Sequence, residues 1–218
     1  MNARDQQIAN DLAKDFQNNR PDISTLTAKA AGGSGYIFEL VLSSGEQRAL
    51  KIYRPDQIDR ADLLDGFERE GKELCSIRHQ RIVRGYDVGT MRFASVGMDL
   101  PFYVMEYVAH DSLEKIIDQN IFPRKLPTLV NLFRQCLEAL AHIHSLNIVH
   151  LDVKEGNLLV DIRNPDSPAI KLSDFGLCKI LIRDDIETNV RGTWTYWPKA
   201  WQDKLHGLIP SNANRVLI

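Results

Sequence analysis

The stretch His150-Leu151-Asp152-Val153-Lys154-Glu155-Gly156-Asn157 is followed further along the chain by Asp174-Phe175-Gly176. The first stretch contains a carboxylate, a cation and an amide oxygen, and the second places another carboxylate at a glycine-containing turn. Phosphoryl transfer needs a base that orients the attacking hydroxyl, a cation near the transferred phosphate, and oxygen ligands for Mg²⁺. We therefore predict a base at Asp152, a phosphate-contacting cation at Lys154, and metal ligands at Asn157 and Asp174.

The two stretches together resemble the catalytic loop and the metal-binding turn of the eukaryotic-type protein kinases. Either stretch alone is common in surface loops and ordinary turns, so their combination and order carry the resemblance. It implies ATP and Mg²⁺ as cofactors and a protein substrate whose hydroxyl accepts the phosphate. It also implies an α+β, protein-kinase-like fold of two lobes, with a β-rich N-lobe and a mainly helical, truncated C-lobe.

The resemblance also divides the chain. We expect the kinase N-lobe and hinge over residues 21–108 and a partial C-lobe, with the catalytic loop and activation segment, over residues 109–218. Residues 1–20 lie before the lobes. Apolar side chains recur there every four residues, at Ile8, Leu12 and Phe16, which predicts a short amphipathic helix packed on the N-lobe.

Residues 30–37 resemble the family's glycine-rich loop, with Ala30 in place of the first glycine. Strands are predicted over residues 23–27 and 37–42, and a turn leads from the second into a third strand over residues 48–53. Lys51 in the third strand has apolar neighbours and therefore needs partners. The resemblance supplies them as the α- and β-phosphates of the nucleotide and a glutamate on the next helix.

That helix is predicted over residues 60–78, where apolar side chains fall largely on one face. The family pattern places the paired glutamate nine residues before a histidine, and Glu70 lies at that distance from His79, since 79 − 70 = 9. Glu68 and Glu73 are neighbouring alternatives.

Residues 102–108 resemble the last strand of the N-lobe and the hinge. The resemblance makes Met105 the gatekeeper, and it assigns the adenine edge to the carbonyl of Glu106 and the amide of Val108. The other residues around the ring could equally be ordinary core. The predicted nucleotide-binding residues are Gly32, Gly33, Gly35, Ile37, Ala49, Lys51, Met105, Glu106, Val108 and Leu159. The predicted catalytic residues are Asp152, Lys154, Lys51 and Glu70.

Beyond the hinge the pattern is mainly helical. A short helix is predicted over residues 112–119 after a cap signal at Asp111, and short strands over 158–161 and 169–172 bracket the catalytic loop. A long helix over residues 126–145 is predicted to have one buried apolar face. That face contains Leu129, Leu132, Phe133, Cys136, Leu137, Leu140 and Ile143.

Composition narrows the function classes. The chain has 218 residues, of which 44% are hydrophobic and 26% charged, and a formal net charge of −2. These values are typical of a globular domain and give no basic surplus to suggest a nucleic-acid partner. No apolar run is long enough for a membrane span, and the N-terminus lacks the apolar core of a signal peptide. Cys75, Cys136 and Cys178 have no metal-ligand spacing and are interpreted as reduced thiols of a cytoplasmic protein.

Three departures from the family pattern affect the second half of the chain. Leu151 replaces an arginine that pairs with a phosphorylated activation segment in the family, so we expect activity that does not depend on phosphate at Thr188, Thr193 or Thr195. Trp197-Pro198-Lys199 stands where the family has Ala-Pro-Glu. The family's central helix is not found before Ile218, so we expect exposed apolar surface that a partner or a missing segment would cover.

Three function classes remain. The first is an active serine/threonine protein kinase, favoured by Lys154, because tyrosine kinases usually have alanine at that position. The second is a pseudokinase or truncated regulatory module that binds nucleotide without efficient transfer, which Lys199 favours. The third is a small-molecule kinase of similar fold, although such enzymes generally lack the segment between Asp174 and Thr193. Transfer of the γ-phosphate to a generic basic protein would separate the first class from the second.

Overall fold

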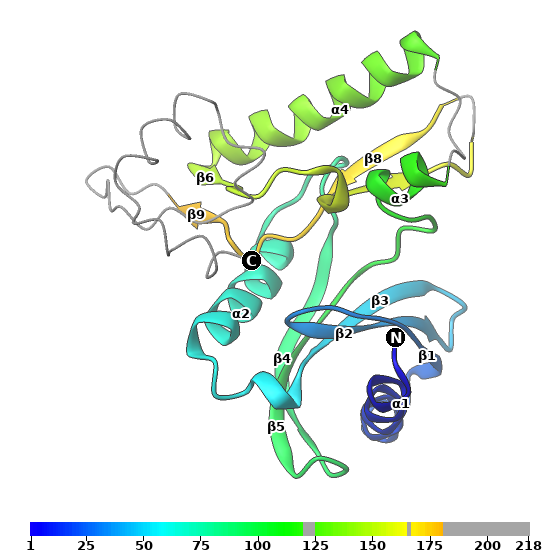
Figure 1. Ribbon diagram of the computed structural model, residues 1–218, viewed down its shortest axis with the longest axis vertical. Helices are drawn as coiled ribbons and strands as arrows, with labels where there is room; N and C mark the ends of the chain where they lie inside the picture. Colours follow the sequence, from blue (N-terminus) through cyan, green and yellow to red (C-terminus); the bar gives the residue numbers. More distant parts are fainter. Residues whose placement is uncertain (120–124, 165–166, 181–218) are drawn as a thin grey trace. The chain divides into compact units, whose positions relative to one another are not determined.

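The computed structural model describes residues 1–119, 125–164 and 167–180. The chain divides into two compact units, Met1–Val108 and a second unit that begins at Ala109. Figure 1 shows the first unit in blue to green and the described part of the second in green to orange. Each unit is described separately.

The first unit is built on a five-stranded antiparallel sheet with the order β1-β2-β3-β5-β4. The strands are β1 (Ile23–Ala31), β2 (Gly35–Leu42), β3 (Gln47–Tyr53), β4 (Gly85–Phe93) and β5 (Met98–Glu106). The predicted strands correspond to β1, β2, β3 and β5, whereas the edge strand β4 was not predicted. With the helices on its two faces, the sheet confirms the α+β class.

Helix α1 (Ala3–Asn18) covers one face of this sheet. Successive side chains of a strand point to opposite faces, and the residues that point toward α1 are almost fully buried. This core contains Ala9, Leu12, Ala13 and Phe16 of α1 together with Tyr36, Phe38, Leu40, Leu50, Ile52 and Phe102 of the sheet. The Phe16 ring meets the edge of the Phe102 ring with the centroids 4.9 Å apart. The predicted packing of the N-terminal helix on the N-lobe sheet is therefore present.

We expect Phe16→Ala to lower the free energy of unfolding of the first unit by about 3–5 kcal/mol, because it removes a buried ring and leaves a cavity. The measurement is urea denaturation followed by fluorescence. Lys14→Ala is the matched control, since Lys14 lies on the exposed side of the same helix and should change stability by less than about 0.5 kcal/mol. Equal losses in the two variants would contradict the packing described here.

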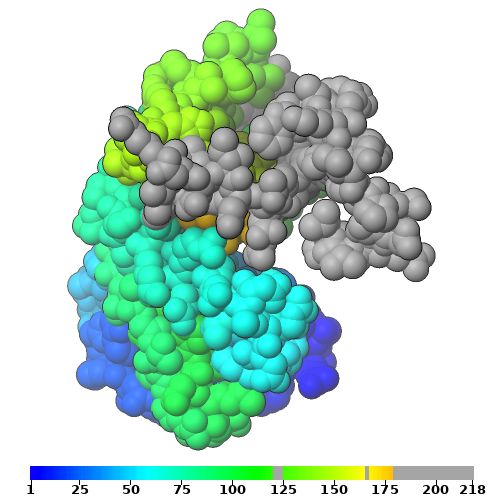
Figure 2. Space-filling model, turned by 90° about the vertical axis from the view of Figure 1, so that its left-hand side faces the viewer, coloured from blue at the N-terminus to red at the C-terminus, as the bar shows by residue number. Residues whose placement is uncertain are grey.

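Helix α2 (Ala61–Ser76) packs on the other face of the sheet, mainly against β4 and β5. The helix comes close to the sheet because its contact residues are small. A Cβ atom on Gly71 would lie 3.0 Å from the Tyr103 ring, and one on Gly85 of β4 would lie 2.5 Å from the backbone nitrogen of Cys75. The outer side of α2 and the 3₁₀ turn before it (Pro55–Gln57) are at the surface, in cyan in Figure 2.

The second unit joins two helices to two small antiparallel sheets. The helices are α3 (Leu113–Asp118) and α4 (Leu126–Ser145). Strand β6 (Ile148–Val149) pairs with β9 (Lys179–Ile180), and β7 (Leu158–Asp161) pairs with β8 (Ala169–Leu172). A 3₁₀ turn (Glu155–Asn157) precedes β7. The long helix and the strand pair β7–β8 confirm the predictions over 126–145, 158–161 and 169–172.

The predicted cap of α3 was wrong by one residue. The N-cap is Ser112, whose hydroxyl accepts a hydrogen bond from the backbone N–H of Lys115. The Asp111 carboxylate instead forms an ion pair with the Lys115 side chain at 2.8 Å. Both residues are good caps, and sequence alone does not say which one adopts the extended conformation.

Helix α4 has two apolar stripes, and only one of them is buried. Leu132, Cys136 and Ile143 are buried as predicted, whereas Leu129, Phe133 and Leu137 are exposed, with 66% of Phe133 accessible. The prediction of a single buried face was therefore wrong for Leu129, Phe133 and Leu137. The sequence of an apolar stripe does not reveal whether a neighbouring element covers it. On the buried side, the Gln135 side chain accepts a hydrogen bond from the Ile170 N–H and donates one to the Pro168 carbonyl.

In the residues that the structure describes, no helix combines the length and the apolar character that crossing a bilayer requires.

Candidate active site

Lys51 and Glu70 form a nearly buried ion pair within the first unit. The Lys51 Nζ lies 2.7 Å from a Glu70 carboxylate oxygen, and the two side chains are 12% and 5% exposed. Strand β3 supplies the lysine and the sheet-facing side of α2 supplies the glutamate. Glu68 pairs instead with Lys72 on the surface of α2, so Glu70 is the glutamate that meets the lysine. Removing two charges from water costs several kcal/mol, which suggests that the pair is kept for a purpose other than stability.

The tip of the β1–β2 hairpin contains the predicted glycine-rich loop. The Gly32 N–H donates a hydrogen bond of 2.8 Å to the Gly35 carbonyl and closes the loop. Gly35 has to be a glycine, because a Cβ atom would lie 2.9 Å from the carbonyl of Ile52. A Cβ atom on Gly33 would meet nothing within 4 Å, and one on Gly32 would only touch the Gly35 oxygen at 3.6 Å. The described chain therefore leaves room beside Gly32 and Gly33 in which a ligand could approach the backbone.

The predicted adenine-site residues of the first unit lie along one face of the sheet. In the strand register Ile37 is opposite Lys51, and Ala49 is opposite Met105. Residues that are directly opposite in an antiparallel pair have their side chains on the same face, so these four share the face away from α1. Glu106 ends β5, and Val108 is the last residue of the first unit. Leu159 belongs to β7 of the second unit.

Lys154 and Asn157 both contact the Asp152 side chain within the second unit. The Lys154 Nζ lies 2.8 Å from the Asp152 Oδ2, and the Asn157 Nδ2 donates to the same oxygen at 2.9 Å. The Asn157 amide also donates to the Asp152 backbone carbonyl at 2.8 Å. Both Asp152 and Asn157 are buried. The three predicted residues of the 150–157 stretch are thus brought together around one carboxylate.

His150 ties this loop to the segment that precedes Asp174. Its Nδ1 accepts a hydrogen bond from the Asp152 N–H at 3.3 Å, so its Nε2 is the nitrogen that donates to the Ser173 carbonyl at 3.0 Å. Burial is the main cause that lowers the pKa of His150 below its usual value of 6.5, and the neutral ring is therefore favoured at neutral pH. The ring also meets the edge of the Phe175 ring, with the centroids 4.9 Å apart. His150 is a structural member of the site to which the sequence analysis gave no role.

Two residues of the site have a backbone conformation that side chains disfavour. Leu151 has φ of 64° and Asp174 has φ of 63°, both in the left-handed region. This conformation costs roughly 1–2 kcal/mol for a residue with a Cβ atom. Such strain is found preferentially at functional sites. Here Leu151 directly follows His150, and Asp174 directly follows Ser173, whose carbonyl accepts the hydrogen bond from His150.

The donor atoms of Asn157 and Asp174 fit Mg²⁺ in kind. Both hydrogen bonds of the Asn157 amide use its nitrogen, which leaves the oxygen as a candidate ligand. Within the described residues the Asp174 carboxylate makes no hydrogen bond or ion pair. The described residues contain no cluster of three or more His, Cys, Asp or Glu side chains that could hold a metal alone. Mg²⁺ is usually bound by one or two carboxylates together with waters and substrate phosphates.

Comparison with known proteins identifies the family. The model of the protein kinase domain matches residues 30–203. The chain belongs to the protein kinase domain family. It is 32% identical to the serine/threonine-protein kinase PrkC of Bacillus subtilis over an alignment of 159 residues, with 70% of this chain and 22% of that protein covered. It is also 32% identical, over 177 residues, to the mitogen-activated protein kinase kinase kinase 5 of Arabidopsis thaliana, with 79% of this chain and 23% of that protein covered. The chain therefore spans about a quarter or less of the length of these relatives.

Family membership confirms the kinase-like α+β fold. The five-stranded sheet, the Lys51–Glu70 pair and the helices that follow are the arrangement expected for this family. The substituted end of the activation segment, residues 197–199, and the threonines at 188, 193 and 195 lie outside the described residues. The expectation that Leu151 makes activity independent of phosphate on that segment remains a prediction.

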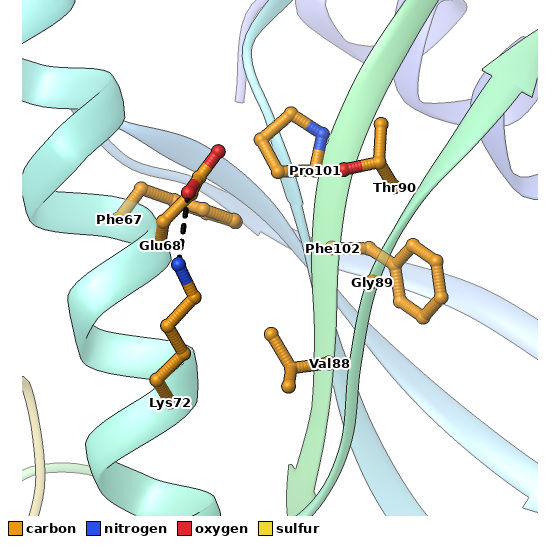
Figure 3. A pocket seen from close by; sticks show the side chains of 8 residues that line it. All are labelled: Phe67, Glu68, Lys72, Val88, Gly89, Thr90, Pro101 and Phe102. Carbon is orange, nitrogen blue, oxygen red and sulfur yellow. Dashed lines mark hydrogen bonds and ion pairs between the residues drawn. The ribbon is translucent and has the colours of Figure 1, made fainter.

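A cavity of about 210 Å³ lies between α2 and strands β4 and β5 of the first unit. Figure 3 shows the Glu68–Lys72 pair at its α2 side and Val88 facing it from β4. None of the predicted nucleotide-binding residues lines this cavity, so it is distinct from the candidate nucleotide site. The complete lining is Phe67, Glu68, Lys72, Val88, Gly89, Thr90, Pro101 and Phe102.

Proposed function

We propose that this chain carries an ATP-dependent serine/threonine protein kinase activity that transfers the γ-phosphate of MgATP to a protein hydroxyl. The observation that carries the proposal is the buried Asp152 carboxylate with Lys154 and Asn157 held against it. A carboxylate whose position is fixed by neighbouring donors is well suited to orient a substrate hydroxyl and accept its proton. Membership of the kinase domain family supports the same assignment.

In this proposal several groups of the chain contact the phosphates of ATP. Lys51, kept in place by Glu70, contacts the α- and β-phosphates, and the glycines at 32, 33 and 35 allow the loop backbone to approach them. Lys154 neutralises charge on the transferred phosphoryl group. Mg²⁺, bound through Asn157 and Asp174, would offset the negative charge of the phosphate oxygens when it is present.

The adenine ring is placed against the sheet face that carries Ile37, Ala49 and Met105. The backbone of Glu106 and Val108 would supply its hydrogen bonds, and Leu159 remains a predicted contact of the ring. Residues 21–108 are then the nucleotide-binding lobe and hinge, and residues 109–218 carry the catalytic loop. The residues 1–20 form the N-terminal helical extension.

A second candidate is a module of the same family that binds nucleotide but transfers phosphate poorly. The exposed stripe of Leu129, Phe133 and Leu137 on α4 favours it, because a contiguous apolar surface of this kind often marks a place where a partner or another segment packs. Full activity would then require that partner.

The deciding experiment incubates the purified chain with radiolabelled ATP, Mg²⁺ and a generic basic protein such as myelin basic protein. The proposal predicts incorporation on serine or threonine that disappears when Mg²⁺ is chelated. Nucleotide binding measured in parallel distinguishes the two candidates, because binding without transfer would support the second and contradict the first. Absence of both would contradict both.

A further inference from the structure

The first turn of α1 reaches the strands that carry the glycine-rich loop. Asp5 lies in this turn, and a single carboxylate oxygen accepts hydrogen bonds from the Tyr36 hydroxyl at 2.9 Å and from the Arg54 guanidinium at 3.0 Å. The Asp5 and Arg54 side chains are only 15% and 16% exposed, and the Tyr36 side chain is fully buried. The contact therefore lies in a largely dry environment, where a charge-assisted hydrogen bond is stronger than on the surface.

Arg54 connects Asp5 to the loop itself. Its backbone N–H donates to the Ser34 carbonyl at 3.2 Å, and its guanidinium reaches the Gly32 carbonyl at 3.5 Å. The guanidinium also lies over the Tyr36 ring, 5.0 Å from its centroid, and Tyr36 is the residue that follows Gly35 in β2. One side chain thus contacts both sides of the hairpin that forms the loop.

The position of Asp5 is fixed by the rest of α1. The Asn2 side chain caps the helix by accepting a hydrogen bond from the Asp5 N–H at 2.8 Å, and Leu12 and Phe16 anchor the following turns in the core. Burial and the hydrogen bond to Asp5 raise the pKa of Tyr36 to about 12. The phenol therefore keeps its proton, and with it the hydrogen bond, throughout the neutral range. The Asp56 carboxylate accepts hydrogen bonds from the Nε and Nη2 of the same guanidinium, so that Nη2 donates to both Asp5 and Asp56, and this pairing limits the freedom of Arg54 further.

We propose that α1 positions the glycine-rich loop for nucleotide binding, with Asp5 and Arg54 as positioning residues that connect the helix to the loop backbone. The inference rests on the proposed nucleotide site, and it adds a part of the chain that lies before the matched kinase domain. A loop that is held in place pays less conformational entropy when it closes on phosphates. Loss of the connection should therefore weaken nucleotide binding without changing the groups that perform the transfer.

The test compares Asp5→Ala with Asp11→Ala, a control on the same helix that removes the same charge from a residue whose described side-chain contact is with Gln7. Asp5→Ala should raise the Kd and the KM for ATP about fivefold, the size expected for losing one hydrogen bond of typical net strength. The kcat should stay within about twofold. Asp11→Ala should change neither value.

A double-mutant cycle tests whether Asp5 acts through Arg54. If it does, Arg54→Ala raises the Kd for ATP at least as much as Asp5→Ala does, and the double variant is no worse than Arg54→Ala alone. Additive losses would overturn the proposed connection. Should Asp5→Ala fail to fold, Asp5→Asn and Tyr36→Phe each weaken part of the contact and should give a smaller shift in the same direction.

Amide hydrogen exchange supplies a readout that does not depend on nucleotide. Exchange of residues 32–35 should accelerate in Asp5→Ala relative to the rest of the sheet. A lower melting temperature with unchanged exchange at the loop would reduce Asp5 to a stabilising residue and overturn the inference. A native chain that binds no nucleotide would contradict the proposed function, while the exchange experiment would still show whether α1 holds the loop.

Discussion

Asp152→Asn is expected to lower the rate of phosphoryl transfer by about 10²- to 10⁴-fold, the range associated with loss of a general base. MgATP binding should persist, because Asp152 is proposed to act on the substrate hydroxyl and not on the nucleotide. Asparagine has nearly the same shape as aspartate, so the loop held by His150 and Asn157 should keep its conformation. The measurements are single-turnover transfer and the Kd for MgATP.

The companion variant Asp174→Asn separates the base from the metal ligand. Its ATP affinity should lose most of its dependence on Mg²⁺, because one of the proposed oxygen ligands no longer carries charge. Asp118→Asn is the matched control, since Asp118 is an exposed residue at the end of α3. An equal loss of nucleotide affinity in Asp152→Asn and Asp174→Asn would contradict the assigned division of roles.

Lys51→Ala is expected to reduce transfer by about 10²-fold or more, comparable with the loss of one preorganised electrostatic contact to the reacting group. The variant also leaves Glu70 buried without its cation, which can cost about 3–5 kcal/mol of stability. The double variant Lys51→Ala/Glu70→Gln removes the uncompensated charge. It should regain stability in thermal unfolding while activity remains low.

This comparison distinguishes a catalytic lysine from a structural one. If the double variant recovered activity together with stability, the ion pair would have only a stabilising role. Lys51 would then no longer be assigned to the proposed nucleotide site. Lys72→Ala provides the control for charge, because Lys72 pairs with Glu68 on the exposed side of the same helix. Its transfer rate should match that of the native chain.

The elements that the sequence predicted well are those with a strong local pattern. A turn between two strand-forming runs marked the strands around Lys51, and helical spacing marked α4 to the residue. Strand β4 was missed because residues 85–93 contain two glycines and two charged residues, and because this edge strand buries few of its side chains. The exposure of Phe133 could not be predicted either, since burial depends on a neighbouring element and not on the residue itself.

In the candidate site, too, the contacts between residues close in sequence were predicted and a contact between distant residues was not. Asp152, Lys154 and Asn157 are close in sequence, so the motif already brought them together, and the spacing to His79 selected Glu70 correctly as the partner of Lys51. The contact between Asp5 and Arg54 joins residues 49 positions apart. The only local signal for Asp5 was its place three residues after the helix cap, which explains its helix but not its partner.

The packing of α1 affects how the kinase domain should be delimited in practice. The family match begins at residue 30, within β1 and after the whole of α1. A fragment trimmed to that limit would lose the cover over Phe38, Leu50 and their neighbours and most of an edge strand as well. Such a fragment would expose a continuous apolar sheet face to water, and poor solubility would then reflect the choice of boundary and not a defect of the kinase fold. Comparative work on this chain should therefore count its folding unit from residue 2, where the cap of α1 begins.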